Sequence, residues 1–114
     1  MENIKIKVKI GKDNNIYNAS LNNNKIYFVD RDEDKTVNIL DLKENTLKRD
    51  NNKYYLKLMF IKGKETDVVL EDKTLNKKLN MKLFTKSIKK SEKYIEIIYT
   101  VNEEEFKITI ERVI

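Results

Sequence analysis

The sequence contains no cysteine, no histidine and no proline, and it has only two glycines among its 114 residues. Without cysteine the chain forms no disulfides, which is typical of a reducing compartment, and we expect a cytoplasmic location. Without histidine or cysteine, a Ser–His or Cys–His nucleophile is excluded, as is a typical zinc site. Phosphate-binding loops and dinucleotide fingerprints need clustered glycines and are excluded as well. We therefore expect a protein without catalytic activity, cofactor or metal.

Long hydrophobic runs are also missing. No segment approaches the ~20 apolar residues of a membrane span, and the first residues lack the hydrophobic block of a secretion signal. We therefore expect neither a membrane span nor export. Apolar residues make up 39% of the chain and charged residues 38%, and both kinds are spread evenly along it. This length and distribution predict a single domain over residues 1–114, built with thin walls rather than thick buried helices.

What the chain does contain is an alternation of apolar and polar residues. Residues 3–10 alternate isoleucine or valine with lysine, and residues 105–113 repeat the pattern with phenylalanine and isoleucine. A period of two is typical of half-buried β-strands. The predicted strands are 3–10, 15–21, 25–30, 35–42, 46–49, 53–61, 66–71, 79–88, 93–101 and 105–113. Polar turn clusters separate them, and because glycine is scarce we expect asparagine to adopt the left-handed turn conformations.

The short connections constrain how these strands pair. A parallel return needs a long crossover, so neighbouring strands are expected to be antiparallel. A meander of this many strands curls and closes, which also removes the exposed edges. We therefore predict an all-β fold, an antiparallel up-and-down barrel of about eight to ten strands. A two-sheet sandwich is the alternative.

Several stretches carry a resemblance to a known family. Residues 81–88 read MKLFTKSI and are followed by the alternating segments 94–101 and 106–113, while residues 24–28 read NKIYF and residues 47–49 read LKR. Together they resemble the YwiB-type family of uncharacterised bacterial proteins. The resemblance implies a calycin-like, or lipocalin-like, barrel and no established activity. The chain departs from the family pattern at residues 50–51, where a glycine is usual, and at residues 69–76, which lack a Pro-x-Gly turn.

Two arginines interrupt the predicted inward-facing rows. Arg49 and Arg112 each follow the phase of the apolar residue two positions earlier, in a chain with only three arginines. A guanidinium binds carboxylate or phosphate in a planar two-point geometry, and a barrel of this size can hold one small ligand. The pattern therefore suggests a lumen site for the acidic head of a small amphipathic ligand. The expected ligand-binding residues are Arg49, Arg112, Tyr99 and Thr85. Fatty-acid-binding barrels, which are calycin relatives, use buried Arg and Tyr in a comparable way.

Two other functions stay open. Both arginines lie near strand ends, where long side chains reach solvent or cap the barrel, so the lumen could be filled and the protein could be a structural or protein-interaction module. The formal charge of +5 and the lysines of residues 86–93 around Tyr94 could instead bind nucleic acid. We do not expect nucleic acid as the partner, because acidic residues are interspersed among the lysines. The sequence leaves the oligomeric state open.

One acidic cluster matches part of a calcium-loop pattern. Asp30, Asp32 and Asp34 occupy positions one, three and five, and Asp41 occupies position twelve. The pattern requires glycine at the sixth position, which is Lys35 here, and helices on both sides, where strands are predicted. We therefore predict a solvated turn.

Overall fold

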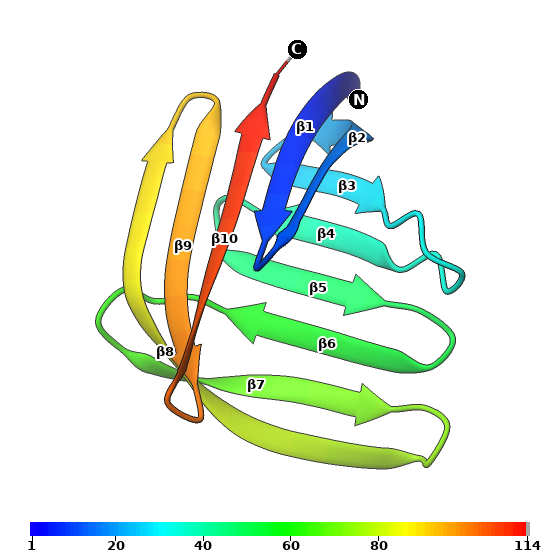
Figure 1. Ribbon diagram of the computed structural model, residues 1–114, viewed down its shortest axis with the longest axis vertical. Coiled ribbons are helices and arrows are strands. Elements are labelled where there is room, and N and C mark those ends of the chain that lie inside the picture. The colour runs from blue at the N-terminus through cyan, green and yellow to red at the C-terminus, as the bar shows by residue number, and fades with distance from the viewer. Residues whose placement is uncertain (114) are drawn as a thin grey trace.

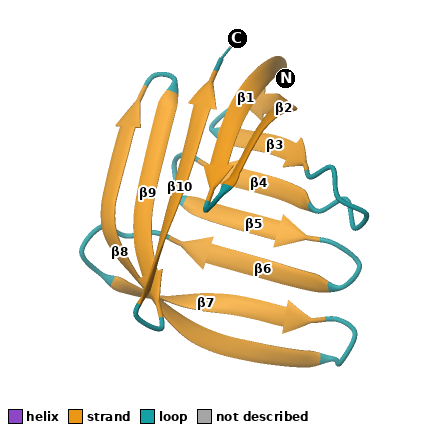
Figure 2. Ribbon diagram, in the orientation of Figure 1, coloured by secondary structure: helices purple, strands orange, loops and turns teal. Residues whose placement is uncertain are grey.

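The computed structural model describes residues 1–113, which form strands and turns without a helix (Figures 1 and 2). Within these residues no helix could span a membrane. The strands are β1 (Glu2–Ile10), β2 (Asp13–Asn22), β3 (Lys25–Val29), β4 (Val37–Asp41), β5 (Thr46–Asp50), β6 (Tyr54–Met59), β7 (Glu65–Asp72), β8 (Lys77–Ser91), β9 (Tyr94–Val101) and β10 (Glu104–Arg112). Each predicted strand is present, and its ends lie within three residues of the expected positions.

Each strand pairs antiparallel with the next, and β1 pairs with β10 to close the barrel. The predicted all-β, antiparallel up-and-down barrel is therefore confirmed, and the sandwich is excluded. The long strand β8 bends. Residues 77–84 pair with β7 and residues 83–91 pair with β9, and the β9 ladder contains a bulge between Thr85 and Ser87, next to the overlap. Figure 1 shows the result: β3 to β7 and the first half of β8 run across the barrel, and the second half of β8 runs upright with β9 and β10. A bulge increases the local bend of a strand, which lets one strand serve both walls.

Asparagine takes four of the eight left-handed positions among the described residues, as the scarcity of glycine predicted, and Gly11, Gly63, Lys35 and Glu103 take the others. Asn23, Asn45, Asn76 and Asn102 have φ angles of 56°, 54°, 52° and 51°. Asparagine tolerates this conformation because its short polar side chain can hydrogen-bond locally. These turns set the register of the strands that they join.

The inward-facing rows fill the centre of the barrel. Ile6 and Leu83 are fully buried, and the ring of Tyr99 lies 5.2 Å from that of Phe60 and 5.4 Å from that of Phe106. The apolar residues that the alternation predicts to face inward are all buried or half-buried: Ile4, Ile6, Val8, Ile10, Phe28, Leu47, Leu56, Leu58, Phe60, Leu83, Ile95, Ile97, Tyr99, Phe106, Ile108 and Ile110. One buried residue breaks the apolar pattern, because Asn38 of β4 is only 1% exposed. An amide at such a position needs hydrogen-bond partners, and these lie at one mouth of the barrel.

Candidate functional site

Arg49 and Arg112 occupy opposite mouths of the barrel. Strand β1 runs from one mouth to the other: its last residue, Ile10, lines a cavity together with Arg49, whereas its first residue, Glu2, forms an ion pair with Arg112. Both arginines follow the inward phase that the sequence predicts. The structure does not bring them together, so they cannot bind one small ligand jointly. We refer to the two ends as the Arg49 mouth and the Arg112 mouth.

At the Arg49 mouth, three polar side chains form a closed triangle. Arg49 donates from Nη2 to Asp30 Oδ2 at 2.6 Å and from Nε to Asn38 Oδ1 at 3.0 Å. Asn38 in turn donates from Nδ2 to Asp30 Oδ1 at 2.8 Å. The side chains of Arg49 and Asp30 are 26% and 17% exposed. Because each member is held by the other two, this arginine is positioned by the protein itself, as expected of a cap.

The cavity beside this triangle is small and contains more acid than base. Its volume is about 90 Å³, roughly that of three water molecules. Asp13, Asp30 and Arg49 are its charged residues, and Tyr17 contributes a phenol whose pKa is raised by burial and by the carboxylate of Asp30. Two carboxylates against one guanidinium disfavour an anionic ligand here.

Thr85 and Tyr99 lie opposite each other in the ladder between β8 and β9. Burial raises the pKa of Tyr99, and the positive charge of Arg49 partly opposes this shift. The structure therefore brings these two predicted residues together, and it places Arg49 close enough to act on the Tyr99 phenol. Thr85 is fully buried, and its Oγ1 has no hydrogen-bond partner among residues 1–113. Aromatic rings pack around Tyr99, so both side chains belong to the filled core.

The Arg112 mouth is larger and more basic. Arg112 Nη2 lies 2.5 Å from Glu2 Oε2, and the backbone N–H of Arg112 donates to the carbonyl of Lys93. The cavity at this mouth has a volume of about 210 Å³. Its apolar lining residues are Leu42, Ile95 and Ile110, and its polar ones are Lys90, Ser91, Glu92, Lys93, Tyr94 and Arg112. An apolar wall beside several cations is suited to a molecule with an apolar body and an acidic end.

The β8–β9 hairpin supplies most of the basic rim. Lys90 reaches across the mouth, where its Nζ donates to the carbonyl of Leu42 at 2.7 Å and to Asn45 Oδ1. The sequence grouped Lys90 and Lys93 with an outer lysine patch, and it did not anticipate that they meet Arg112. The missing information was the pairing of β10 with both β9 and β1, which is a property of the closed barrel.

The outer lysine patch of residues 86–93 is partly neutralised. Lys86 forms an ion pair with Glu105 at 2.8 Å, and Tyr94 donates from its hydroxyl to Glu96 at 2.8 Å. This hydrogen bond raises the pKa of Tyr94 and lowers that of Glu96. Acids are thus interspersed among the lysines on this face, as the sequence suggested.

The aspartates of the calcium-loop pattern have separate partners. Asp30 binds Arg49, Asp34 lies 3.2 Å from Lys53, and Asp41 accepts two backbone N–H bonds in the turn after β4. These two bonds contribute to a lowered pKa of Asp41. No cluster of three acidic side chains suited to a metal ion is found in residues 1–113.

Comparisons with known proteins support the fold. No protein-family model matches the chain, and no curated protein matches it. Among solved structures, the chain is similar to the YwiB protein from Bacillus subtilis, with a TM-score of 0.59 and 18% sequence identity over 98% of this chain and 89% of that one. At this level of identity the match shows a YwiB-like fold. It agrees with the resemblance drawn from residues 24–28, 47–49 and 81–113.

Proposed function

We propose that the protein is a non-catalytic binding barrel that takes a small amphipathic molecule with an acidic end at the Arg112 mouth. The observation that carries this proposal is the cavity of about 210 Å³ in which Leu42, Ile95 and Ile110 lie beside Arg112 and two lysines. The apolar residues would receive the ligand body, and the cations would bind its carboxylate or phosphate. Burial of apolar area contributes ~25 cal/mol per Å², and the charged contacts orient the ligand.

The two mouths differ in the chemistry that they favour. The Arg49 mouth is small, and the carboxylates of Asp13 and Asp30 outnumber its one guanidinium. The Arg112 mouth has more than twice that volume, and Lys90 and Lys93 add positive charge to its rim. Of the four residues expected from the sequence, Arg112 is therefore the proposed anchor. Arg49 is assigned to the cap at its own mouth, and Tyr99 and Thr85 are assigned to the filled core.

The volume of the cavity limits the ligand. Pockets for drug-sized molecules measure ~300–1,000 Å³, so this cavity accommodates a smaller molecule or one end of a longer one. Short straight-chain carboxylates are the appropriate probes. Alcohols and amines of the same chain length share the apolar body and lack the acidic end, so they are the matched controls.

Native mass spectrometry and amide NMR test this proposal on the intact protein. We expect carboxylates of about six to ten carbons to bind and to shift the resonances of residues 90–95 and 110–112, with weaker binding of the alcohols and amines. Arg112→Met should weaken carboxylate binding at least tenfold. Arg31→Met, at the remaining arginine, should leave it unchanged. Unchanged binding in Arg112→Met, or shifts confined to the Arg49 mouth, would refute the assignment.

A protein-interaction module is the second candidate, and one observation favours it. The centre of the barrel is filled by Phe60, Tyr99 and Phe106, so a large lumen ligand has no room there. Nucleic acid is the weakest candidate, since Glu96 and Glu105 accompany the outer lysines. Binding to single-stranded oligonucleotides that falls steeply with salt would support it.

Two finer assignments belong to the same proposal. The closed up-and-down meander supports a barrel of the calycin type. The absence of cysteine supports a cytoplasmic protein.

A further inference from the structure

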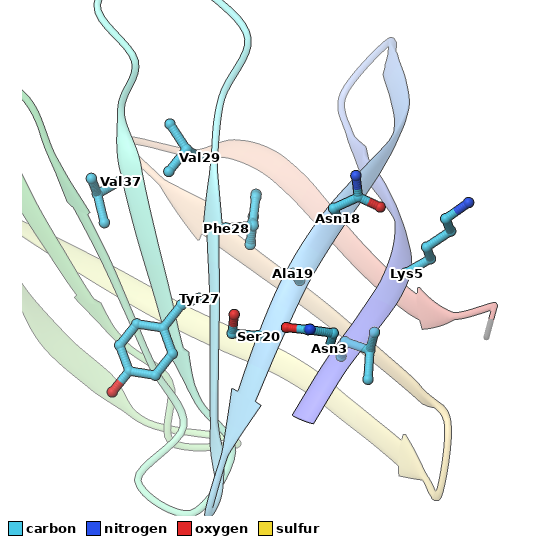
Figure 3. Close-up of a pocket in the computed structure, with 10 residues that line it drawn as sticks. Asn3, Lys5, Asn18, Ala19, Ser20, Tyr27, Phe28, Val29 and Val37 are labelled. Carbon is cyan, nitrogen blue, oxygen red and sulfur yellow. The ribbon is translucent and has the colours of Figure 1, made fainter. Parts of the chain in front are cut away.

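The barrel wall is splayed between β2 and β3. Strand β2 pairs with β1 from Glu2↔Leu21 to Ile10↔Asp13, but it pairs with β3 only from Ser20↔Tyr27 to Asn22↔Lys25. Residues 13–19 of β2 therefore have a ladder on one side only. Phe28 and Val29 pair with β4 and not with β2. Figure 3 shows the two strands diverging from their hairpin.

A groove of about 700 Å³ lies at this seam. On the β3–β4 side, Val29 and Val37 form a cross-strand pair, and the two residues are 47% and 41% exposed. The β1–β2 side is polar and includes Lys5 (Figure 3). Buried Phe28 and Ala19 also line the groove. The groove thus has one apolar wall and one polar, basic wall.

We infer that this seam binds an extended peptide segment of a partner protein by strand addition. An unpaired strand edge presents N–H and C=O groups that an extended backbone satisfies, which is the usual basis of strand addition. Arg31 already donates to the carbonyl of Ile16, so a side chain of the protein satisfies part of this edge. A bound peptide would pair with the part of β2 that has diverged from β3, around Ile16 and Asn18, in place of this Arg31 contact.

The walls specify the sequence of the peptide. Side chains of a strand alternate between the two faces. Those on the outer face would pack on Val29 and Val37, which selects apolar residues. Those facing inward would meet Phe28 and Tyr17, whose ring centroids lie 5.1 Å apart across the seam, which selects small residues. Lys5 on the opposite wall selects an aspartate or glutamate by charge complementarity.

A displayed library of random peptides about eight residues long is the probe, with the wild-type protein as bait and Val29→Glu as counter-selection. We expect enrichment of peptides that alternate apolar and small residues and carry an acidic residue. Val29→Glu and Lys5→Glu should each weaken a selected peptide at least tenfold, which corresponds to ~1.4 kcal/mol. Leu79→Glu, at an exposed apolar residue of β8, is the matched control and should bind normally.

Hydrogen exchange of the wild-type complex tests the backbone pairing without any variant. We expect slower exchange of the amides of Ile16, Asn18 and Val29, whose N–H groups lie on the strand edges facing the seam, and loss of binding when the peptide backbone is N-methylated at alternate residues. Failure to enrich peptides over the counter-selection, or protection elsewhere, would overturn the inference. Self-association that Val29→Glu abolishes, without peptide binding, would assign the groove to a second copy of the chain instead.

Discussion

Asn38 lies directly opposite Arg49 in the ladder between β4 and β5, and its Oδ1 accepts a hydrogen bond from Arg49 Nε at 3.0 Å. A buried amide thus holds an inward-facing guanidinium at the end of the barrel. The same amide donates to Asp30, which neutralises the arginine. One buried polar residue therefore positions the charged side chains of the Arg49 mouth.

Replacing Asn38 should lower the free energy of unfolding more than the small size of its side chain suggests. Asn38→Leu keeps the branching of the side chain at Cγ and leaves the Arg49 Nε–H and an Asp30 oxygen without a partner, so we expect a loss of about 1–3 kcal/mol in the free energy of unfolding. Urea denaturation measures this loss. Asn80→Leu, at an exposed position of β8, should change stability by less than about 0.5 kcal/mol. Equal effects of the two substitutions would contradict the assigned role of the triangle.

Thr85→Val should stabilise the protein. The hydroxyl of Thr85 is fully buried without a hydrogen-bond partner among the described residues, so its removal recovers a desolvation cost of about 1–3 kcal/mol at most. Thr66 offers the reverse case, because its Oγ1 donates to the carbonyl of Met59. Thr66→Val should lower the melting temperature, and Thr85→Val should raise it. A lower melting temperature for Thr85→Val would mean that the hydroxyl has a stabilising partner.

The β9–β10 turn holds a strained residue. Asn102 and Glu103 form a two-residue hairpin loop with φ angles of 51° and 66°. Turns with two positive φ angles favour Asn-Gly, and the left-handed conformation costs a non-glycine residue ~1 kcal/mol. We expect Glu103→Gly to raise the free energy of unfolding by up to about 1 kcal/mol. Glu103→Gln removes the same charge and retains the strain, so it should not reproduce the gain in thermal denaturation.

Tyr99 should make the protein sensitive to alkali. Burial raises the pKa of this phenol above its ordinary value of 10.0, so the folded state retains the proton at a pH where the unfolded state loses it. Its contribution to stability is therefore fully present below pH 10 and declines as the pH rises through the folded pKa. Tyr99→Phe should reduce the loss of stability above pH 10, measured by urea denaturation at several pH values. Tyr27→Phe, at the groove, is the comparison, and an identical pH profile for both variants would refute this prediction.

The strand pattern was predictable because it depends on local chemistry. Alternation over residues 3–10 or 105–113 requires only that one face of a strand is buried. The same alternation predicted that Arg49 and Arg112 face inward. The role of Asn38 was harder to predict. Its strand β4 is short, and an asparagine among apolar residues does not show which groups it will bond.

The sequence by itself determined the strands, their alternation, the asparagine turns and the antiparallel order, because each depends on neighbouring residues and short connections. Only the tertiary structure decided the size and charge of the two mouths at which Arg49 and Arg112 lie, because side chains of several strands line each mouth. It also decided that Lys90 and Lys93 join Arg112 and that β2 diverges from β3. These arrangements follow from closing one sheet on itself, which brings together residues that are distant in the chain.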